Sequence, residues 1–208
     1  GRGYGILMSR NLEKVLVWRE IGSESIREYE YLLMQLNAME YRFSAFVIDG
    51  RRGVIQLLMH KYPGIPIQMC QFHQIQIVKR YIPGKAKTEA ARDLRKITLN
   101  LTKTYEAEFT RDLDEWHVKY GDFLKEKSLI EETNRWHYTH RRLRSAYRSL
   151  CTNLSYLFTF QKQSRLQIPN TTNHCDGLFA HLKQKILIHR GISKKRRKQM
   201  IDYFLENF

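Results

Sequence analysis

Short runs of apolar residues separated by polar turns dominate the first 84 positions of the chain. Residues 4–8 and 14–18 are two such runs with a polar turn between them, which predicts a β-hairpin. Over residues 25–39 the apolar positions recur at helical spacing, and Ser25 and Glu28 have the Ser-x-x-Glu spacing of a capping box. We therefore expect an amphipathic helix after the hairpin.

Two further strand-like runs follow, and each ends at a residue that could carry chemistry. Residues 43–48 are nearly all apolar, which is typical of a central strand buried on both faces, and they run into Asp49. Residues 65–69 form the second run, which ends at Cys70. Helices are expected after these strands, at residues 54–60 and 73–81. This alternation predicts a three-layer α/β fold with a mixed sheet.

The pattern changes after Pro83-Gly84, which closes the α/β part. Residues 85–160 contain no Pro and a single Gly, and they are rich in Lys, Arg, Glu, Leu and aromatic residues. This composition predicts an all-helical block. Its helices are expected at about 86–109, 110–126, 128–137 and 140–160, and two more, at about 174–188 and 194–208, follow a polar loop.

The charge of the chain adds an anionic partner to this picture. Among 208 residues there are 36 Lys and Arg against 21 Asp and Glu, a net charge of +15. A domain this basic is typical of nucleic-acid binding. Two clusters hold many of the cations. The first is residues 135–144, where aromatic residues are interspersed among basic ones that include Arg141, Arg142 and Arg144, and the second is the run Lys194, Lys195, Arg196 and Arg197. Such clusters contact phosphates, although a solvated helix face has the same composition.

Composition also excludes several classes of protein. Hydrophobic residues make up 42% of the chain, which is enough for a folded core. No stretch approaches the roughly 18 uninterrupted apolar residues that a membrane-spanning helix needs, so we expect no membrane association. The three cysteines are too few for a disulfide framework, which favours a reducing compartment such as the cytoplasm.

Asp49 is the first candidate for a functional residue. It follows a predicted buried strand, and ligands of open α/β sheets bind beyond the carboxyl ends of the strands. A carboxylate in that place can hold Mg²⁺, which prefers one or two carboxylates together with substrate phosphates and water. Asp49 with Gly50 is equally a common turn pair, so a purely structural role stays open.

Cys70 and His73 form the second candidate, at the junction of a strand and a helix. Their spacing suits half of a zinc site with His174 and Cys175, although adjacent residues rarely both reach one ion. Cys70 could instead act as a nucleophile, or it could pack beneath the sheet while His73 contacts a phosphate or orients a metal ligand. A buried Cys and a hydrogen-bonded His without a catalytic role is the fourth interpretation.

Asp176 is the third candidate. Thr172 or Asn173 is the expected N-cap of helix 174–188, which puts Asp176 in the first turn. The helix dipole stabilises an acidic residue there by about 0.3–1 kcal/mol, whatever its function. Asp176 shares a helix face with Lys183, an arrangement that suits a surface where a metal and a phosphate backbone lie side by side.

Taken in order, these segments resemble the catalytic region of DDE transposases of the Mutator-like group, which includes bacterial insertion-sequence enzymes. The family has an Asp after its fourth strand, a Cys-x-x-His after its fifth, and a Thr-Thr-Asn-x-x-acid-Gly motif that opens its last core helix. The matching segments are Val47-Ile48-Asp49-Gly50, Cys70-Gln71-Phe72-His73 and Asn170-Thr171-Thr172-Asn173-His174-Cys175-Asp176-Gly177, with Phe179 and Lys183 beyond. Their order agrees over nearly the whole chain.

The resemblance implies a ribonuclease H-like core that is interrupted by a helical insertion. Residues 1–84 and 166–208 would then form the core, and residues 85–165 the insertion. The separation of Asp49 and Asp176 by 127 residues, with the helical block between them, agrees with this organisation.

The resemblance also implies a two-metal mechanism that uses Mg²⁺ or Mn²⁺. Asp49 and Asp176 would be the second and third carboxylates of the metal site, and Cys70 and His73 would shape it. Such an enzyme nicks the ends of a mobile element and joins them to target DNA. It would act on double-stranded DNA as a homo-oligomer, in a prokaryotic cytoplasm.

Two departures from the family pattern stand out. The third acid of the family is usually Glu, and Asp176 is one methylene shorter; Glu131 and Glu132 are alternatives, but they lack the motif. The family's first Asp lies on the first core strand, whereas Asp49 is the first Asp of this chain. The opening Gly-Arg-Gly-Tyr-Gly resembles the stretch that follows that first Asp. We therefore expect these 208 residues to begin just after it and to be inactive alone.

Three other functions stay open. A decayed or domesticated transposase would bind DNA without cutting it, and the missing first Asp and the shorter third acid favour this alternative. Another ribonuclease H-like nuclease, such as a resolvase or an RNase, would share the fold but not the preference for element ends. A small zinc-binding α/β protein would use Cys70 and His73.

Overall fold

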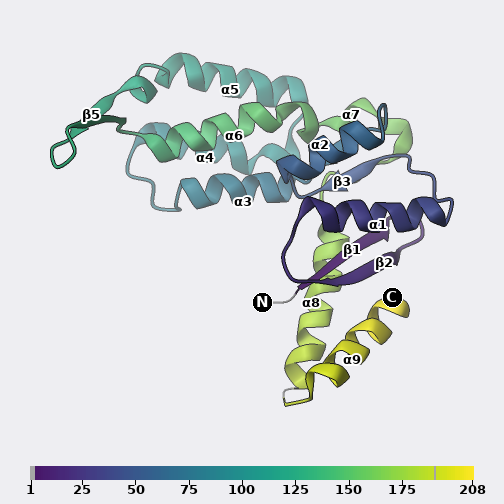
Figure 1. The fold of residues 1–208 in the computed structure, drawn as a ribbon. Coiled ribbons are helices and arrows are strands. Elements are labelled where there is room, and N and C mark those ends of the chain that lie inside the picture. The colour runs from purple at the N-terminus through teal and green to yellow at the C-terminus, as the bar shows by residue number, and fades with distance from the viewer. Residues whose placement is uncertain (1–2, 190) are drawn as a thin grey trace. The chain divides into compact units, whose positions relative to one another are not determined.

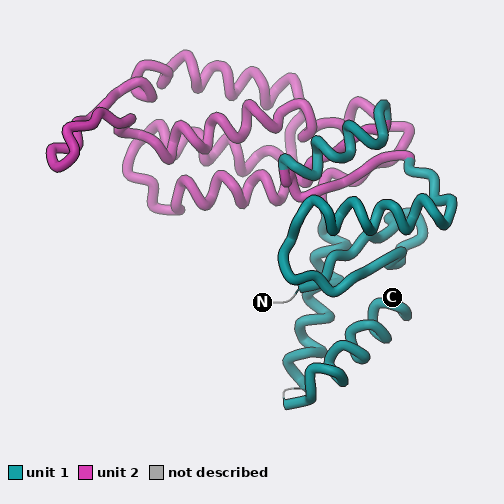
Figure 2. The backbone as a smooth tube through the Cα atoms, in the orientation of Figure 1, with its two compact units in different colours: residues 1–43, 52–64, 172–208 teal, residues 44–51, 65–171 magenta. Residues whose placement is uncertain are grey.

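The computed structural model describes residues 3–189 and 191–208, which divide into two compact units. Unit 1 comprises residues 1–43, 52–64 and 172–208, and unit 2 comprises residues 44–51 and 65–171 (Figure 2). This division departs from the expected boundary at 84/85, because residues 65–84 group with the helical segment rather than with the N-terminal hairpin. Gly1 and Arg2, the first two residues of the opening stretch that resembles the sequence after the family's first Asp, lie outside the described residues.

Unit 1 is built on the predicted β-hairpin. Strands β1 (Gly3–Ser9) and β2 (Lys14–Ile21) form an antiparallel pair (Figure 1). Their register shifts between Leu7 and Met8. The helices of this unit are α1 (Ile26–Ala38), α2 (Arg52–Lys61), α8 (Asn173–Ile188) and α9 (Lys194–Glu206). The predicted hairpin and all four helices are confirmed, with ends that differ by a few residues.

Two apolar clusters hold unit 1 together. Leu32 and Leu36 of α1 pack with Val17 of the hairpin, and all three are buried. The other cluster joins Val15 to apolar residues of α8 and α9: Leu178, Leu182, Ile201 and Leu205. A hydrogen bond of 3.1 Å from the Trp18 indole nitrogen to Asp202 Oδ1 adds a polar link between β2 and α9. The helix that carries Asp176 is thus anchored to the hairpin and to α9.

The start of α1 shows how a local motif is overridden. Ser25 is the N-cap, as expected, but its side chain makes no capping hydrogen bond. The predicted capping box is therefore wrong in its contacts. Glu28 instead forms an ion pair with Arg19 of β2, with 3.5 Å between Glu28 Oε2 and Arg19 Nε.

Unit 2 combines one parallel strand pair with a helical block. β3 (Phe46–Ile48) pairs with β4 (Ile67–Met69), and α3 (Gln71–Tyr81) follows β4 directly. The block continues with α4 (Glu89–Leu99), α5 (Glu106–Tyr120), strands β5 (Lys127–Ile130) and β6 (Arg135–Tyr138), α6 (Arg141–Leu157) and α7 (Thr159–Lys162), with short 3₁₀ turns at Leu101–Lys103, Phe123–Lys125 and Ser164–Leu166. Its core includes Leu94, Phe109, Leu150 and Phe158.

The expectation of an all-helical block is wrong at two places. The helix expected at 86–109 is two helices, because the chain turns at Leu101–Lys103 and Thr104 takes an extended conformation. The helix expected at 128–137 is the antiparallel hairpin β5–β6. Asn134 has φ +48° in its turn, and the aromatic residues at 136 and 138 suit a strand, which explains the preference for a hairpin.

The expected mixed sheet is present only as separate pairs. Within the described residues, the strands form three two-stranded sheets, β1–β2, β3–β4 and β5–β6. Residues Phe46–Ile48 are half-buried rather than fully buried, because β3 has a strand partner on one side only in this part of the chain. The fold is therefore mixed α/β and largely helical, with small sheets.

Helix length bears on the expectation about membranes. The longest helix, among those the structure describes, is α6 with 17 residues, and it is amphipathic. Across residues 3–189 and 191–208, no helix is both long enough and apolar enough to cross a bilayer.

Candidate functional site

Three of the sequence motifs begin at one edge of the parallel strand pair in unit 2. The backbone N–H of Cys70 donates to the carbonyl of Ile48 over 2.7 Å, and Asp49 follows Ile48 directly. The next residue, Gln71, donates its backbone N–H to the carbonyl of Asn170 over 2.9 Å. Parallel strands end at the same edge, so β3 and β4 bring these segments together although 121 residues separate Asp49 from Asn170.

Asp49 is exposed at this edge, between β3 and α2. The backbone beside it is constrained, because Gly50 has φ +93° and the side chain of Met69 fills the space that a Cβ would need. Only glycine fits there without strain. The turn therefore fixes the backbone of Asp49 and leaves its carboxylate in solvent, which suits both a metal ligand and a turn residue.

Cys70 and His73 lie in different surroundings. Cys70 is the N-cap of α3 and is fully buried, with its carbonyl accepting the backbone N–H of Gln74. His73 is half-buried, one turn into the helix. Burial of Cys70 agrees with the interpretation that it packs beneath the strand ends and argues against a nucleophilic role, which needs access to substrate.

Asp176 belongs to unit 1. Thr172 is the N-cap of α8, as one of the two sequence alternatives had it, and Asp176 is exposed in the first turn. Its backbone N–H donates to the Thr172 carbonyl over 3.0 Å, and the Thr172 hydroxyl lies 3.5 Å from Asp176 Oδ2. Lys183 is exposed two turns further along α8.

The first basic cluster is partly structural. Arg144 donates to the carbonyl of Leu124 over 2.7 Å, and its guanidinium lies 3.6 Å from the centre of the Tyr138 ring, so it holds the base of the β5–β6 hairpin. Arg142 donates to the carbonyl of Arg80 near the end of α3. Arg141, the remaining residue of the predicted three, is exposed at the start of α6. Sequence reasoning missed these internal roles because the partners are distant in the chain.

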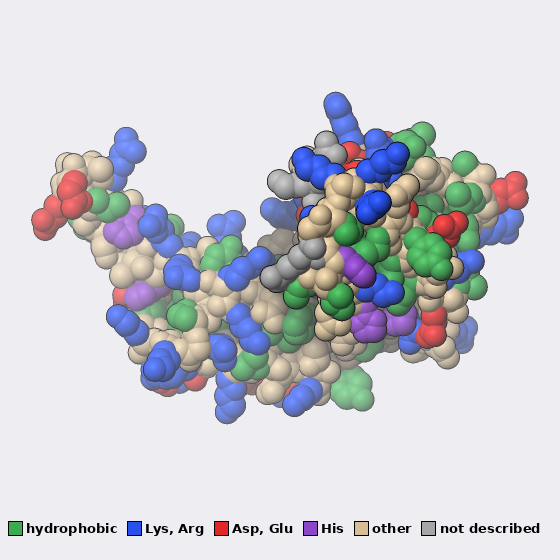
Figure 3. All heavy atoms as spheres, turned by 90° about the horizontal axis from the view of Figure 1, so that it is seen from below, with side chains coloured by type: hydrophobic (Ala, Val, Ile, Leu, Met, Phe, Trp, Pro, Cys, Tyr) green, Lys and Arg blue, Asp and Glu red, His purple; other side chains and the backbone are tan. Residues whose placement is uncertain are grey.

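The second basic cluster is fully exposed. Lys194, Lys195, Arg196 and Arg197 form the first turn of α9, where the Ser193 hydroxyl accepts the backbone N–H of Arg196 over 3.3 Å. The next residue, Lys198, instead forms an ion pair within the helix, in which its Nζ donates a hydrogen bond to Asp202 Oδ2 over 2.6 Å. This hydrogen bond raises the pKa of the Lys198 ammonium above its ordinary value. Lys and Arg side chains are spread over the visible face of the molecule (Figure 3).

Cations in the first turn of a helix are unfavourable, because the helix dipole places partial positive charge there. Four consecutive cations at the start of α9 therefore lower the stability of the helix rather than raise it. An anion bound at this turn would offset this destabilisation, since it would interact favourably with the cationic side chains and with the N-terminal end of the helix. The stability of α9 therefore does not explain why the four cations stand at its start.

Metal ligation has no ready-made cluster in the described part of the chain. No three His, Cys, Asp or Glu side chains within residues 3–189 and 191–208 are grouped so that they could hold an ion. A shallow hollow on the outer face of α5 is lined by Arg111, Asp114 and Glu115 and includes none of the predicted site residues. Asp49 and Asp176 each offer an exposed carboxylate, the donor that Mg²⁺ prefers, so their chemistry fits this ion.

Comparison of the chain with protein-family models, with curated proteins and with solved structures finds no match. The functional assignment therefore rests on the residues themselves and on how unit 2 assembles them. Sequence reasoning did not single out Gln68, Gln71 and Gln74, three buried amides beside Cys70. Their spacing of three residues was the available signal, since glutamine is rarely buried without a hydrogen-bonding role.

Proposed function

We propose that this chain is the catalytic region of a DDE-type transposase similar to the Mutator-like group, which cleaves DNA at the ends of a mobile element and joins them to target DNA. The observation that supports this function best is the edge of the β3–β4 pair. Asp49, the Cys70–His73 segment and Asn170 converge there, in the order and at the junctions of the family motifs. A ribonuclease H-like core around this edge is part of the proposal.

In this function Asp49 and Asp176 would hold Mg²⁺ or Mn²⁺ together with a first carboxylate. The ions would supply Lewis-acid stabilisation of the phosphodiester and a reactive hydroxyl nucleophile. Cys70 would contribute a buried side chain at the end of β4, and Gly50 would fix the backbone of the turn that contains Asp49. The shorter side chain of Asp176 reaches less far than Glu would.

The basic surface supports DNA as the partner. Lys194, Lys195, Arg196 and Arg197 present four exposed cations in one helix turn, with Lys183 on the preceding helix of the same unit. Phosphate contacts of this kind are independent of sequence and position a protein on the duplex. They also favour the second candidate, a transposase-derived protein that binds DNA without cutting it, because binding needs the cations and not the carboxylates.

Cleavage by the full-length protein tests the proposal. We expect Mg²⁺- or Mn²⁺-dependent nicking of labelled duplexes that carry the element ends, and joining of those ends to a supercoiled plasmid. Arbitrary duplexes and RNA–DNA hybrids should be cut much less. Equal cutting of all three would instead identify another ribonuclease H-like nuclease. Binding without cutting in both metals would favour the non-catalytic alternative.

The role of the α9 cluster can be tested by its salt dependence. Replacing Lys194, Lys195, Arg196 and Arg197 by Gln should weaken duplex binding and reduce the log–log salt slope by about 0.9 for each lost phosphate contact. The measurement is a series of binding titrations between about 50 and 200 mM salt.

The matched control removes the same charge elsewhere. Replacing Lys85, Lys87, Lys96 and Lys103, four exposed lysines of unit 2, by Gln lowers the net charge equally. We expect this variant to change the salt slope far less. If both variants flatten the slope to the same extent, net charge rather than the α9 cluster determines binding.

A further inference from the structure

Three glutamine side chains are fully buried around the start of α3. Gln68 lies in β4 and Gln71 and Gln74 lie in α3, and each is 0% exposed. A buried amide without partners is costly, because it has lost its hydrogen bonds to water and gained none in return. Each of the three is satisfied at both its nitrogen and its oxygen, by partners that come from other segments of unit 2.

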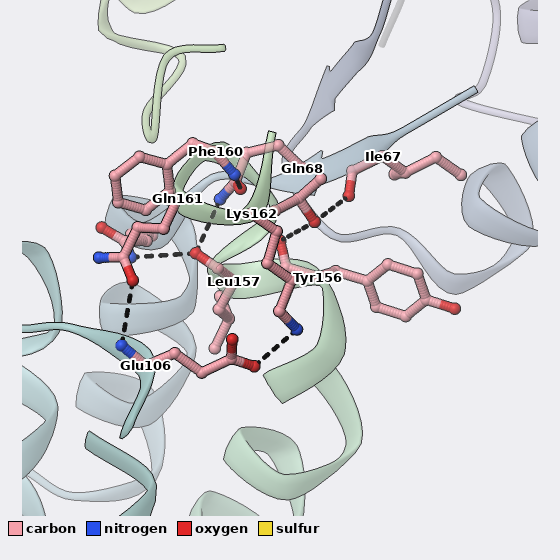
Figure 4. A network of polar contacts seen from close by, with 10 residues as sticks. Ile67, Gln68, Glu106, Tyr156, Leu157, Phe160, Gln161 and Lys162 are labelled. Carbon is pink, nitrogen blue, oxygen red and sulfur yellow. Dashed lines mark hydrogen bonds and ion pairs between the residues drawn. The ribbon is translucent and has the colours of Figure 1, made fainter. Parts of the chain in front are cut away.

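Gln68 and Gln71 share one acceptor at the end of α6. The carbonyl of Leu157 accepts a hydrogen bond from Gln68 Nε2 over 2.9 Å, and Gln68 Oε1 accepts the backbone N–H of Phe160 over 2.9 Å (Figure 4). The same carbonyl accepts a second hydrogen bond from Gln71 Nε2 over 3.0 Å. The last carbonyls of a helix have no partner within the helix, so these amides complete the end of α6. The amide group of Gln71 is thereby fixed in orientation, with its oxygen directed away from Leu157.

The oxygen of Gln71 holds Asn170. Gln71 Oε1 accepts Asn170 Nδ2 over 3.0 Å, while the backbone N–H of Gln71 donates to the Asn170 carbonyl over 2.9 Å. Two hydrogen bonds from one residue to another fix both the position and the rotation of Asn170. The start of the Asn170–Gly177 motif is thus attached to the carboxyl end of β4.

Consecutive backbone N–H groups at the end of β4 therefore reach both acid-bearing segments. The N–H of Cys70 donates to the carbonyl of Ile48, the residue before Asp49. The N–H of Gln71 donates to the carbonyl of Asn170, six residues before Asp176. We propose that Gln71 and Asn170 form an amide clamp that positions the chain leading to Asp176, so that both are positioning residues for the metal-dependent reaction. This role rests on the proposed function.

The test replaces Asn170, which is half-buried, by Ala in the full-length protein. The matched control is Asn153→Ala, which removes a similar amide pair, because Asn153 Nδ2 donates to Gln74 Oε1 over 2.8 Å without contacting Asn170. Both variants leave one buried glutamine oxygen without its donor. Both should therefore lower the midpoint of thermal unfolding by a similar amount.

Hydrogen exchange separates the clamp from general stability. Asn170→Ala should speed exchange of the backbone amides of residues 171–176 by about tenfold or more, since losing the contact frees the segment. Asn153→Ala should leave those amides unchanged. If the two variants give the same exchange pattern at 171–176, the amide clamp is refuted, whether or not the protein cleaves DNA.

Metal titration of cleavage supplies the functional readout. Asn170→Ala should raise the Mg²⁺ concentration needed for half-maximal cleavage by about 10–100-fold, the usual effect of losing a contact behind a metal ligand. Asn153→Ala should leave it unchanged, and Asn170→Asp, which cannot donate to Gln71 Oε1, should behave like Asn170→Ala. A wild-type protein that never cleaves, but whose Asn170→Ala variant exchanges faster at 171–176, would overturn the proposed function and leave the clamp standing. Unchanged Mg²⁺ dependence in a cleaving Asn170→Ala variant would overturn the positioning role.

Discussion

Replacing Asp49 by Asn in the full-length protein is expected to reduce Mg²⁺-dependent DNA cleavage by about a thousandfold or more. Asn keeps the size of the side chain and suits the Asp49-Gly50 turn, but it loses the negative charge that a divalent ion requires. A thousandfold corresponds to about 4 kcal/mol of transition-state stabilisation, which is the scale of a metal's contribution. Asp49 is exposed, so the substitution should not change stability.

The measurement pairs single-turnover cleavage with duplex binding. Binding by Asp49→Asn should stay within about twofold of wild type, because the phosphate contacts that dominate affinity lie elsewhere. Asp176→Asn should behave in the same way. Asp122→Asn is the control, since the Asp122 side chain is 97% exposed and its Oδ1 lies 2.8 Å from Lys125 Nζ, three residues away. If Asp49→Asn cleaves as fast as wild type, Asp49 is a turn residue and the metal site lies elsewhere.

Replacing Phe158 by Ala should destabilise unit 2 by about 3–5 kcal/mol. Phe158 is fully buried where α6 ends, and its ring centre lies 5.6 Å from that of Phe109 of α5. Removal of the ring leaves a cavity that rigid helices on both sides fill only in part. For a chain of this size, each kcal/mol lowers the midpoint of thermal unfolding by about 2–4 °C.

Trp116, which is buried in the same cluster, reports this unfolding by its fluorescence. Val118→Ala is the matched control on α5, because Val118 is 87% exposed and its loss should change stability by less than about 0.5 kcal/mol. A Phe158→Ala variant that unfolds within about 1 kcal/mol of wild type would show that this core repacks around the cavity. The end of α6 would then be held chiefly by its hydrogen bonds to Gln68 and Gln71.

The candidate site was visible from the sequence only in part. The positions of Asp49 and Cys70 at strand ends followed from two apolar runs that each stopped at a polar or small residue. The loop before α8 allowed two N-caps, Thr172 and Asn173, and the structure has Thr172. The roles of these residues in catalysis stay predictions. The amide clamp could not be predicted from the sequence, because glutamine has no characteristic local pattern. The partners of Gln71, Leu157 and Asn170, lie 86 and 99 residues away from it in the chain.

Residues 128–138 show why the secondary structure of the helical block was harder to predict from the sequence than that of the N-terminal part. Charged and aromatic residues in this stretch satisfy a helical pattern and a strand pattern about equally, so local propensity does not decide between them. Pairing of β5 with β6 and the stacking of Arg144 on Tyr138 do decide, and both contacts are made only in the folded chain. A preference of a few tenths of a kcal/mol per residue yields to such contacts.

Local periodicity by itself determined the N-terminal hairpin, α1, α8 and α9, and composition alone determined the excess of basic residues. These features depend on neighbours within about one or two helical turns, which the sequence displays directly. Tertiary structure alone decided the break between α4 and α5, the β5–β6 hairpin and the separation of the strands into pairs. It also decided that Arg142 and Arg144 donate hydrogen bonds to backbone carbonyls of other segments. Each of these is a choice among partners far apart in the chain, and buried hydrogen bonds and packing settle that choice only when the partners meet.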